Sequence, residues 1–260
     1  MRNALAIARK EFRGYFTSPI AYATIGLFAL IFGLMFVAFL RFFMEQSLRA
    51  GAGGQMGMGG PQTVNVNQML IRPLLLQASV VVLFVLPLLS MRTFAEEKRS
   101  GTMELLLTSP LRDWEIILGK FFGAAGLYAL MLAVTMLSVV WLFIYGNPEW
   151  RQVLAGYLGL LLLGSSFLSL GMFISNLTQN QIVACFITFA VLLLLLLLNW
   201  VAEFAGPTMR EVLTTLSITE HFDDFAKGVI DTRHLVYYAS FIFFGLFLTS
   251  RSLDADRWRG

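Results

Sequence analysis

The chain has 260 residues, of which 57% are apolar and 13% charged, and its mean hydropathy is +0.73. Soluble domains carry about 25% charged residues, so this composition excludes an ordinary soluble globular domain and indicates a membrane protein. The formal net charge of +3 arises from basic residues at the ends of apolar runs and in loops, not on one aromatic-lined surface, which argues against nucleic-acid binding.

Six apolar runs approach or exceed the ~20 residues that an α-helix needs to cross a hydrocarbon core of roughly 30 Å. They cover residues 20–40, 73–91, 121–145, 153–174, 182–201 and 235–250, and the last run is the shortest. We therefore predict an all-α polytopic membrane protein in which residues 1–260 form a single transmembrane domain.

The first 19 residues carry the pattern of a helix that lies at a membrane surface. Arg2, Arg9 and Arg13 share one helical face. The other face would carry apolar residues at spacings of three and four, namely Leu5, Ala8, Phe12, Tyr15 and Phe16. We predict an amphipathic elbow helix over residues 1–19, with simple anchoring by positive charge as the alternative.

Residues 92–120 form the densest long block of charge between two apolar runs, and we expect this block to face water. Within it the breakers Ser100-Gly101 and Ser109-Pro110 bracket a short amphipathic patch that contains three consecutive leucines. An exposed apolar patch of this kind predicts a docking element for a partner protein. Twelve of the 19 Lys and Arg residues fall on the side of the N-terminus, which predicts that both termini and this block are cytoplasmic.

Small residues recur at helical spacing in two of the predicted spans. Gly119 and Gly123 form a GxxxG pattern at the start of the third span, and Gly164, Ser165, Ser169 and Gly171 give the fourth span a small-residue face. Such faces usually allow close helix packing, and the alternative is that they line a transport pathway.

The polar segment 202–234 lies on the predicted outer side and contains both histidines of the chain. His221 and Asp224 are three residues apart, which is a usable spacing for metal ligands. However, Phe222, Phe225 and Val229 also repeat at three and four, so a short helix with a solvated acidic face explains the same residues. We expect the structural role and no metal site, because two histidines without a third close ligand are a weak signal.

Several motifs of energy-coupled or catalytic proteins are absent from the sequence. There is no G-x-x-x-x-G-K-[ST] motif for phosphate binding, no H-E-x-x-H and no G-x-S-x-G, and no charged residue lies deep within a predicted span. An ion-coupled pump normally needs an intramembrane charge. The energy for any transport should therefore come from another protein.

Three stretches, residues 9–22, 90–121 and 220–238, resemble the ABC-2 type permeases, which are membrane subunits of ABC transporters. The stretch 90–121, with the sequence SMRTFAEEKRSGTMELLLTSPLRDWEIILGKF, is the most specific of the three. Among the branches of this family the chain looks most like the gliding-motility-associated permease, and the nitrous-oxide-reductase maturation permease is a near relative.

This resemblance implies six transmembrane helices per subunit, an N-terminal elbow helix and a cytoplasmic coupling helix between the second and third spans. It implies that the coupling helix enters a cleft on a separate cytoplasmic P-loop ATPase through Met103, Glu104, Leu105, Leu106, Leu107 and Thr108. The residues expected to flank that contact are Glu96, Glu97, Lys98 and Arg99.

The same resemblance implies no cofactor on this chain, since ATP and Mg would be bound by the partner ATPase. It further implies a second permease subunit, identical or related, together with membrane lipid and an auxiliary extracytoplasmic protein as further partners. The expected location is the bacterial inner membrane. The substrate is not implied, because the family exports lipids, glycans, drugs and peptides, and some members transmit force instead.

Three other functions are consistent with parts of the sequence. One is a membrane-embedded enzyme that uses His221, Asp224 and His234, although the sequence shows no nucleophile or third ligand beside them. A second is a non-transporting scaffold that recruits an ATPase to a surface machine. A third is a permease that takes part in metal handling.

Overall fold

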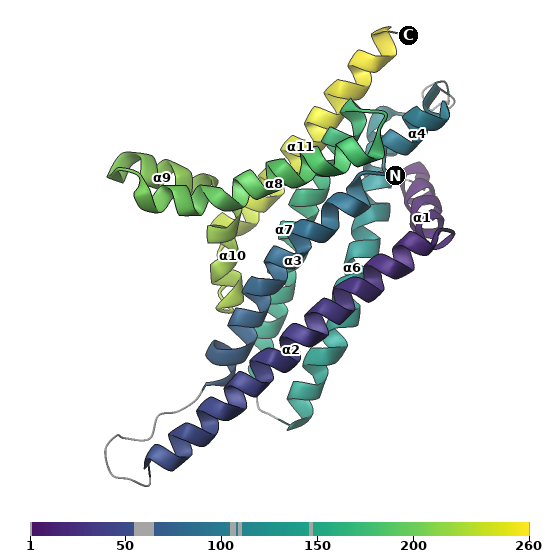
Figure 1. The fold of residues 1–260 in the computed structure, drawn as a ribbon. Helices are drawn as coiled ribbons and strands as arrows, with labels where there is room; N and C mark the ends of the chain where they lie inside the picture. Colours follow the sequence, from purple (N-terminus) through teal and green to yellow (C-terminus); the bar gives the residue numbers. More distant parts are fainter. Residues whose placement is uncertain (1, 55–64, 105–107, 109–110, 146–147, 260) are drawn as a thin grey trace.

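The computed structural model describes residues 2–54, 65–104, 108, 111–145 and 148–259, and every regular element within these ranges is a helix. Figure 1 shows a bundle of long helices with shorter helices at its sides. The elements are α1 (Arg2–Phe16), α2 (Pro19–Gly54), η1 (Asn67–Ile71), α3 (Arg72–Ser90), α4 (Ala95–Ser100), α6 (Asp113–Tyr145), α7 (Trp150–Leu177), α8 (Gln181–Phe204), α9 (Pro207–Leu216), α10 (Ile218–Ala226) and α11 (Thr232–Arg259). The predicted all-α fold is therefore confirmed.

Six stretches within the described ranges are long and apolar enough to cross a membrane, as predicted. They are Ala21–Ala50, Asn67–Ser100, Asp113–Ile144, Trp150–Leu177, Gln181–Ala202 and Thr232–Ala255. Most extend beyond the predicted apolar runs, because a helix satisfies its own backbone hydrogen bonds and can continue into water. The longest helix, α2, has 36 residues.

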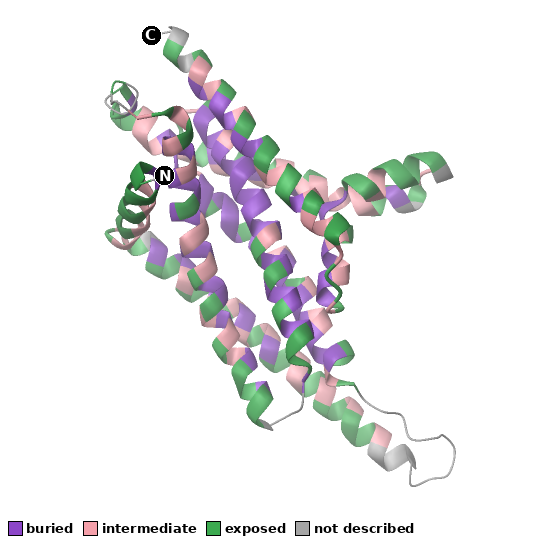
Figure 2. Ribbon diagram, turned by 180° about the vertical axis from the view of Figure 1, so that it is seen from behind, coloured by how far each residue is buried: buried purple, intermediate pink, exposed green. Residues whose placement is uncertain are grey.

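The spans differ in the share of their residues that is buried, and by this measure one helix is central and others are peripheral. In α7 72% of the most apolar stretch is buried, whereas the corresponding share is 17% in both α2 and α8. Figure 2 shows buried residues where the helices meet and exposed residues along the outer sides of the bundle. The exposed residues of α2 and α8 are largely apolar, including Leu30, Leu34, Ile182 and Phe186, as expected for helices that face lipid or another subunit.

The predicted small-residue face of the fourth span packs closely against its neighbours. A Cβ atom placed on Gly164 would lie 2.3 Å from Cε1 of Tyr128 in α6, and one on Gly171 would lie 2.1 Å from Oγ of Ser90 in α3. Since real Cβ atoms do not approach so closely, these positions require glycine if the helices are to keep their separation. α7 is thus surrounded by α3, α6, α8, α10 and α11, and it forms the centre of the fold.

Candidate functional site

The polar segment that follows α3 is ordered by a sharp turn and a short helix. α3 ends at Ser90, and α4 begins at Ala95 with Glu96 and Glu97 in its first turn. Negative charge in the first turn is favourable because of the helix dipole. Gly101 ends α4 with a φ of 71°, a left-handed conformation that glycine adopts without steric cost. The predicted break at Ser100-Gly101 is therefore the end of a helix.

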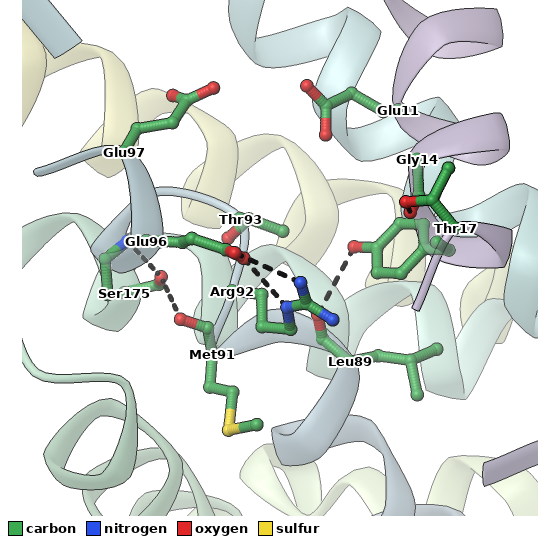
Figure 3. A network of polar contacts seen from close by, with 12 residues as sticks. Glu11, Gly14, Thr17, Leu89, Met91, Arg92, Thr93, Glu96, Glu97 and Ser175 are labelled. Carbon is green, nitrogen blue, oxygen red and sulfur yellow. Dashed lines mark hydrogen bonds and ion pairs between the residues drawn. The ribbon is translucent and has the colours of Figure 1, made fainter. Parts of the chain in front are cut away.

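Ser175, near the end of the central helix α7, holds the start of α4. The backbone N–H groups of Phe94 and Ala95 donate to Oγ of Ser175 at 3.2 and 3.1 Å. The Ser175 hydroxyl in turn donates to the carbonyl of Met91 at 2.9 Å, as Figure 3 shows. At the other end of α4, the ammonium group of Lys98 donates to the carbonyl of Asn176. Both ends of α4 are thereby joined to α7.

A buried lysine joins α4 to two further helices. Lys120, on α6, is only 2% exposed, and its Nζ lies 2.7 Å from Oε1 of Glu97 and 3.3 Å from Oε1 of Glu11. The same ammonium group donates to the carbonyl of Thr93 at 2.8 Å and lies 5.2 Å from the ring centre of Phe94. An isolated buried ammonium group is costly, and these contacts offset that cost. We call this group of five residues the Lys120 cluster.

Another ion pair lies beside the Lys120 cluster. Arg92 binds Glu96 through two hydrogen bonds of 2.8 and 3.1 Å, and Figure 3 shows the two side chains facing one another. The hydroxyl of Tyr15, on α1, donates to the carbonyl of Leu89 at 3.3 Å, and burial raises the pKa of Tyr15. Both contacts fix the turn after α3 to its surroundings.

A polar cavity of about 270 Å³ lies between α1, α4 and α6. Its lining combines three cationic and three anionic side chains, together with Gly14, Tyr15, Thr17 and Thr93; the charged residues are Lys10, Glu11, Arg92, Glu96, Glu97 and Lys120. No group of three or more His, Cys, Asp or Glu side chains in the part of the chain that the structure describes is arranged to hold a metal ion.

The GxxxG pattern of α6 is the surface on which α1 packs. A Cβ atom on Gly119 would lie 2.6 Å from Cβ of Ile7, and one on Gly123 would lie 2.7 Å from Cβ of Glu11. The predicted close packing is confirmed at this position, and its partner is the N-terminal helix. Leu5, which belongs to the predicted apolar face of this helix, is 75% exposed, and Ala4 is buried.

The structure places the predicted docking residues in different environments. Met103 is buried, whereas Glu104 and Thr108 are exposed, and the Thr108 hydroxyl donates to the carbonyl of Glu104 at 2.9 Å. Leu105, Leu106 and Leu107 lie outside the described residues. Of the predicted flanking residues, Glu96, Glu97 and Lys98 are half-buried and make the contacts given above, and Arg99 is exposed.

The polar segment near the other end of the bundle is also anchored to α7. Phe222 and Phe225, on α10, are fully buried, and a Cβ atom on Gly159 would lie 2.5 Å from Cβ of Phe225. The predicted apolar face thus packs against a neighbouring span. Val229, which was assigned to the same face, is exposed because α10 ends at Ala226.

The structure also brings the two histidines together. His221 lies on α10 and His234 on α11, and Asp224 contacts His234. The sequence did not predict the contact between the rings, since thirteen residues and the end of a helix separate them.

Comparison with known proteins identifies the family. The family described as "ABC-2 family transporter protein" matches residues 5–245. The permease named "Probable multidrug ABC transporter permease YbhR", from Escherichia coli strain K12 and from strain O157:H7, is 28% identical to the chain over 137 residues. That alignment covers 52% of this chain and 37% of the relative, so the chain matches well under half of the relative's length.

The chain belongs to the ABC-2 family of transporter proteins, and it is a multi-pass membrane subunit of that family. Neither comparison supports the narrower resemblance to the gliding-motility permease.

Proposed function

We propose that this ABC-2 family protein converts the movement of a separate ATPase into export across the bacterial inner membrane. In this proposal ATP and Mg²⁺ are bound by the ATPase, which contacts the segment after α4. Met103, Glu104 and Thr108 belong to that contact together with Leu105, Leu106 and Leu107. The distribution of basic residues supports a cytoplasmic position for this end of the bundle.

The observation that carries the proposal is the way α4 is tied to the transmembrane helices. Ser175 and the carbonyl of Asn176 join α4 to the centre of the bundle, and Lys120 joins it to α1 and α6. A force applied beyond Gly101 would therefore act on three helices at once and not on a loose loop. This is the property expected of an element that transmits movement from a partner.

The relative's name supports a proposal for the substrate class. A permease that resembles this chain over 137 residues is described as a probable multidrug transporter. We propose that this protein likewise exports apolar or amphipathic compounds, and that a second copy of the chain or a related subunit contacts the exposed apolar faces of α2 and α8.

The decisive test is a charge placed in the proposed contact. If Leu106 docks on the ATPase, Leu106→Asp should weaken the complex by several kcal/mol, because a charge would be desolvated in the interface. The measurement is co-purification of the ATPase with the full-length permease. Leu177→Asp is a matched control, since Leu177 is an exposed leucine at the same end of the bundle.

The outcomes separate export from other roles. Loss of the ATPase in Leu106→Asp but not in Leu177→Asp supports the docking assignment, and undiminished co-purification contradicts it. Reconstituted vesicles then test transport itself. ATP-dependent uptake of an amphipathic dye into inside-out vesicles supports export, whereas a stable complex that hydrolyses ATP without any transport favours a scaffold or a force-transmitting role.

A further inference from the structure

The two histidines form a continuous chain of polar contacts that links three helices. Nε2 of His221 lies 3.0 Å from the carbonyl oxygen of Thr215, at the end of α9. Nδ1 of His221 lies 2.8 Å from Nδ1 of His234, on α11. Nε2 of His234 lies 2.9 Å from Oδ2 of Asp224, on α10. Every ring nitrogen of the pair therefore has a polar partner.

The number of protons in this series of hydrogen bonds can be counted, starting from the Thr215 carbonyl at one end and the Asp224 carboxylate at the other. A backbone carbonyl only accepts, so Nε2 of His221 must carry a proton. The carboxylate of Asp224 also accepts, so Nε2 of His234 must carry one too. If both rings were neutral, each Nδ1 would then hold only a lone pair, and two lone pairs would face each other at 2.8 Å. The observed contact requires one further proton.

We propose that His221 and His234 bind a single proton between their Nδ1 atoms, and that this proton holds α11 against α10. In this state His234 is an imidazolium that donates to both His221 and Asp224, and His221 is neutral. This proton-binding site lies in a part of the protein distant from α4. The inference is independent of the proposed function. We call it the His221–His234 pair.

The surroundings of the pair favour this distribution of charge. Desolvation lowers the pKa of His221, and the neighbouring His234 lowers it further, so His221 is the ring that stays neutral. The hydrogen bond from His234, followed by that from Lys227, lowers the pKa of Asp224, so this carboxylate is ionised wherever histidine titrates. The negative charge of Asp224 then stabilises an imidazolium at position 234.

The other titratable and charged groups that face the pair belong to the helices around it. Glu220, on α10, acts electrostatically on His221, and the ring of Tyr237, on α11, packs against the His221 ring with centroids 3.9 Å apart and planes tilted by 33°. Asp224 also pairs with Lys227 at 3.0 Å, and Lys227 pairs with Asp223, which binds Arg72 on α3. α9 contributes the Thr215 carbonyl, which has no charge to titrate.

The direction of the pH dependence follows from the proton count. As the pH rises and the shared proton leaves, the two lone pairs repel and the Nδ1–Nδ1 contact between α10 and α11 is lost. As the pH falls and His221 gains a proton of its own, two N–H groups face each other and the same contact is lost. The contact should therefore be strongest between the two macroscopic pKa values of the pair.

Histidine-selective ¹⁵N labelling tests the proposal directly, because the chain contains only two histidines. The full-length protein would be purified through a tag that contains no histidine, placed in lipid nanodiscs and studied by NMR from about pH 5 to 9, where histidine titrates. Near neutral pH we expect one ring protonated on both nitrogens and the other protonated on Nε2 alone. Two neutral rings at neutral pH would overturn the proposal. So would two rings that each gain a proton at the same pH without affecting one another.

The carboxylates of α10 supply a matched pair of variants. Asp224→Asn keeps an acceptor beside His234 but removes its charge, so the shared proton should bind at least about tenfold more weakly and leave about 1 pH unit lower. Asp223→Asn removes a neighbouring carboxylate that binds Arg72 and Lys227 and does not touch the pair. A shift that is equal in both variants would contradict the assignment.

Two further measurements distinguish the shared proton from two alternatives. These are a purely structural role of the His221–His234 pair and a metal site. Hydrogen exchange of the α10 amides, corrected for the intrinsic effect of pH, should be slowest at intermediate pH, and this optimum should vanish in His234→Phe, which keeps a ring beside Phe225. An unchanged optimum in that variant would overturn the proposal. Equimolar Zn²⁺ should leave both ring signals unchanged, and displacement of the shared proton by the metal would identify a metal site instead.

Discussion

Lys120 shows how much a single side chain depends on partners from distant parts of the sequence. It is buried, and its two carboxylate partners come from α1 and α4, 109 and 23 positions away. One oxygen of Glu97, Oε2, is buried without a hydrogen-bond partner, so this carboxylate relies on its contact with Lys120. The stability of the junction therefore depends on the charge of one ammonium group.

Lys120→Met should destabilise the protein by roughly 1–3 kcal/mol, because it removes the ammonium partner of two half-buried carboxylates, Glu97 and Glu11. Arg92→Met is the control, since the Arg92–Glu96 pair is partly exposed and its loss should cost about 1 kcal/mol or less. Thermal unfolding of the two variants in the same detergent measures the difference. If both variants lost the same amount of stability, the burial of Lys120 would not determine the strength of its contacts.

At the scale of the helices, glycine positions determine where elements can approach. Gly123 lies under α1, whereas a Cβ atom on Gly33, in α2, would meet nothing within 4 Å. Both glycines lie within helices, where alanine is intrinsically favoured by about 1 kcal/mol. The two positions therefore share the same backbone conformation and differ in packing.

The same substitution should have opposite effects at the two sites. Gly33→Ala should be neutral or stabilising by up to about 1 kcal/mol. Gly123→Ala forces a new methyl group to within 2.7 Å of Cβ of Glu11 and should destabilise by about 1–3 kcal/mol. Thermal unfolding gives the sign, and faster hydrogen exchange confined to α1 would locate the damage. Stabilisation at Gly123 would show that α1 does not pack there.

The sequence predicted the elements better than their contacts. The six spans could be found because length and apolar composition determine which segments cross a bilayer. The GxxxG pattern at Gly119 predicted a close approach but could not name α1 as the partner. The burial of Lys120 could not be predicted, because its position at the edge of a span looks the same as that of a lysine facing water. The contact between His221 and His234 likewise required the chain reversal after α10.

At the scale of the whole molecule, the two chain ends lie at the same end of the bundle as α1 and α4, as Figure 1 shows. α6 ends and α7 begins at the opposite end. This arrangement follows from an even number of spans. We propose that this end faces the cytoplasm, because more basic residues lie on the side of α1.

Cysteine labelling in intact cells tests this orientation. In a Cys185→Ala background, which removes the only native thiol, Lys227→Cys should react with a membrane-impermeant maleimide from outside, and Ser100→Cys should react only after permeabilisation. Both positions are exposed, so a lack of reaction reports the membrane side and not burial. Labelling of Ser100→Cys in intact cells would reverse the topology and would also remove the proposed contact with a cytoplasmic ATPase.

The glycines of α7 have a consequence for the stiffness of the molecule. Because Tyr128 and Ser90 approach the backbone of α7 directly, rotation of this helix about its axis would bring bulkier residues into the same space. α7, α6 and α3 therefore form the stiff part of the bundle, whereas α2 and α8 are largely exposed along their outer sides and have fewer steric constraints. The helices that can move most easily are therefore the peripheral ones. A neighbouring subunit or lipid can change their tilt without repacking the interior.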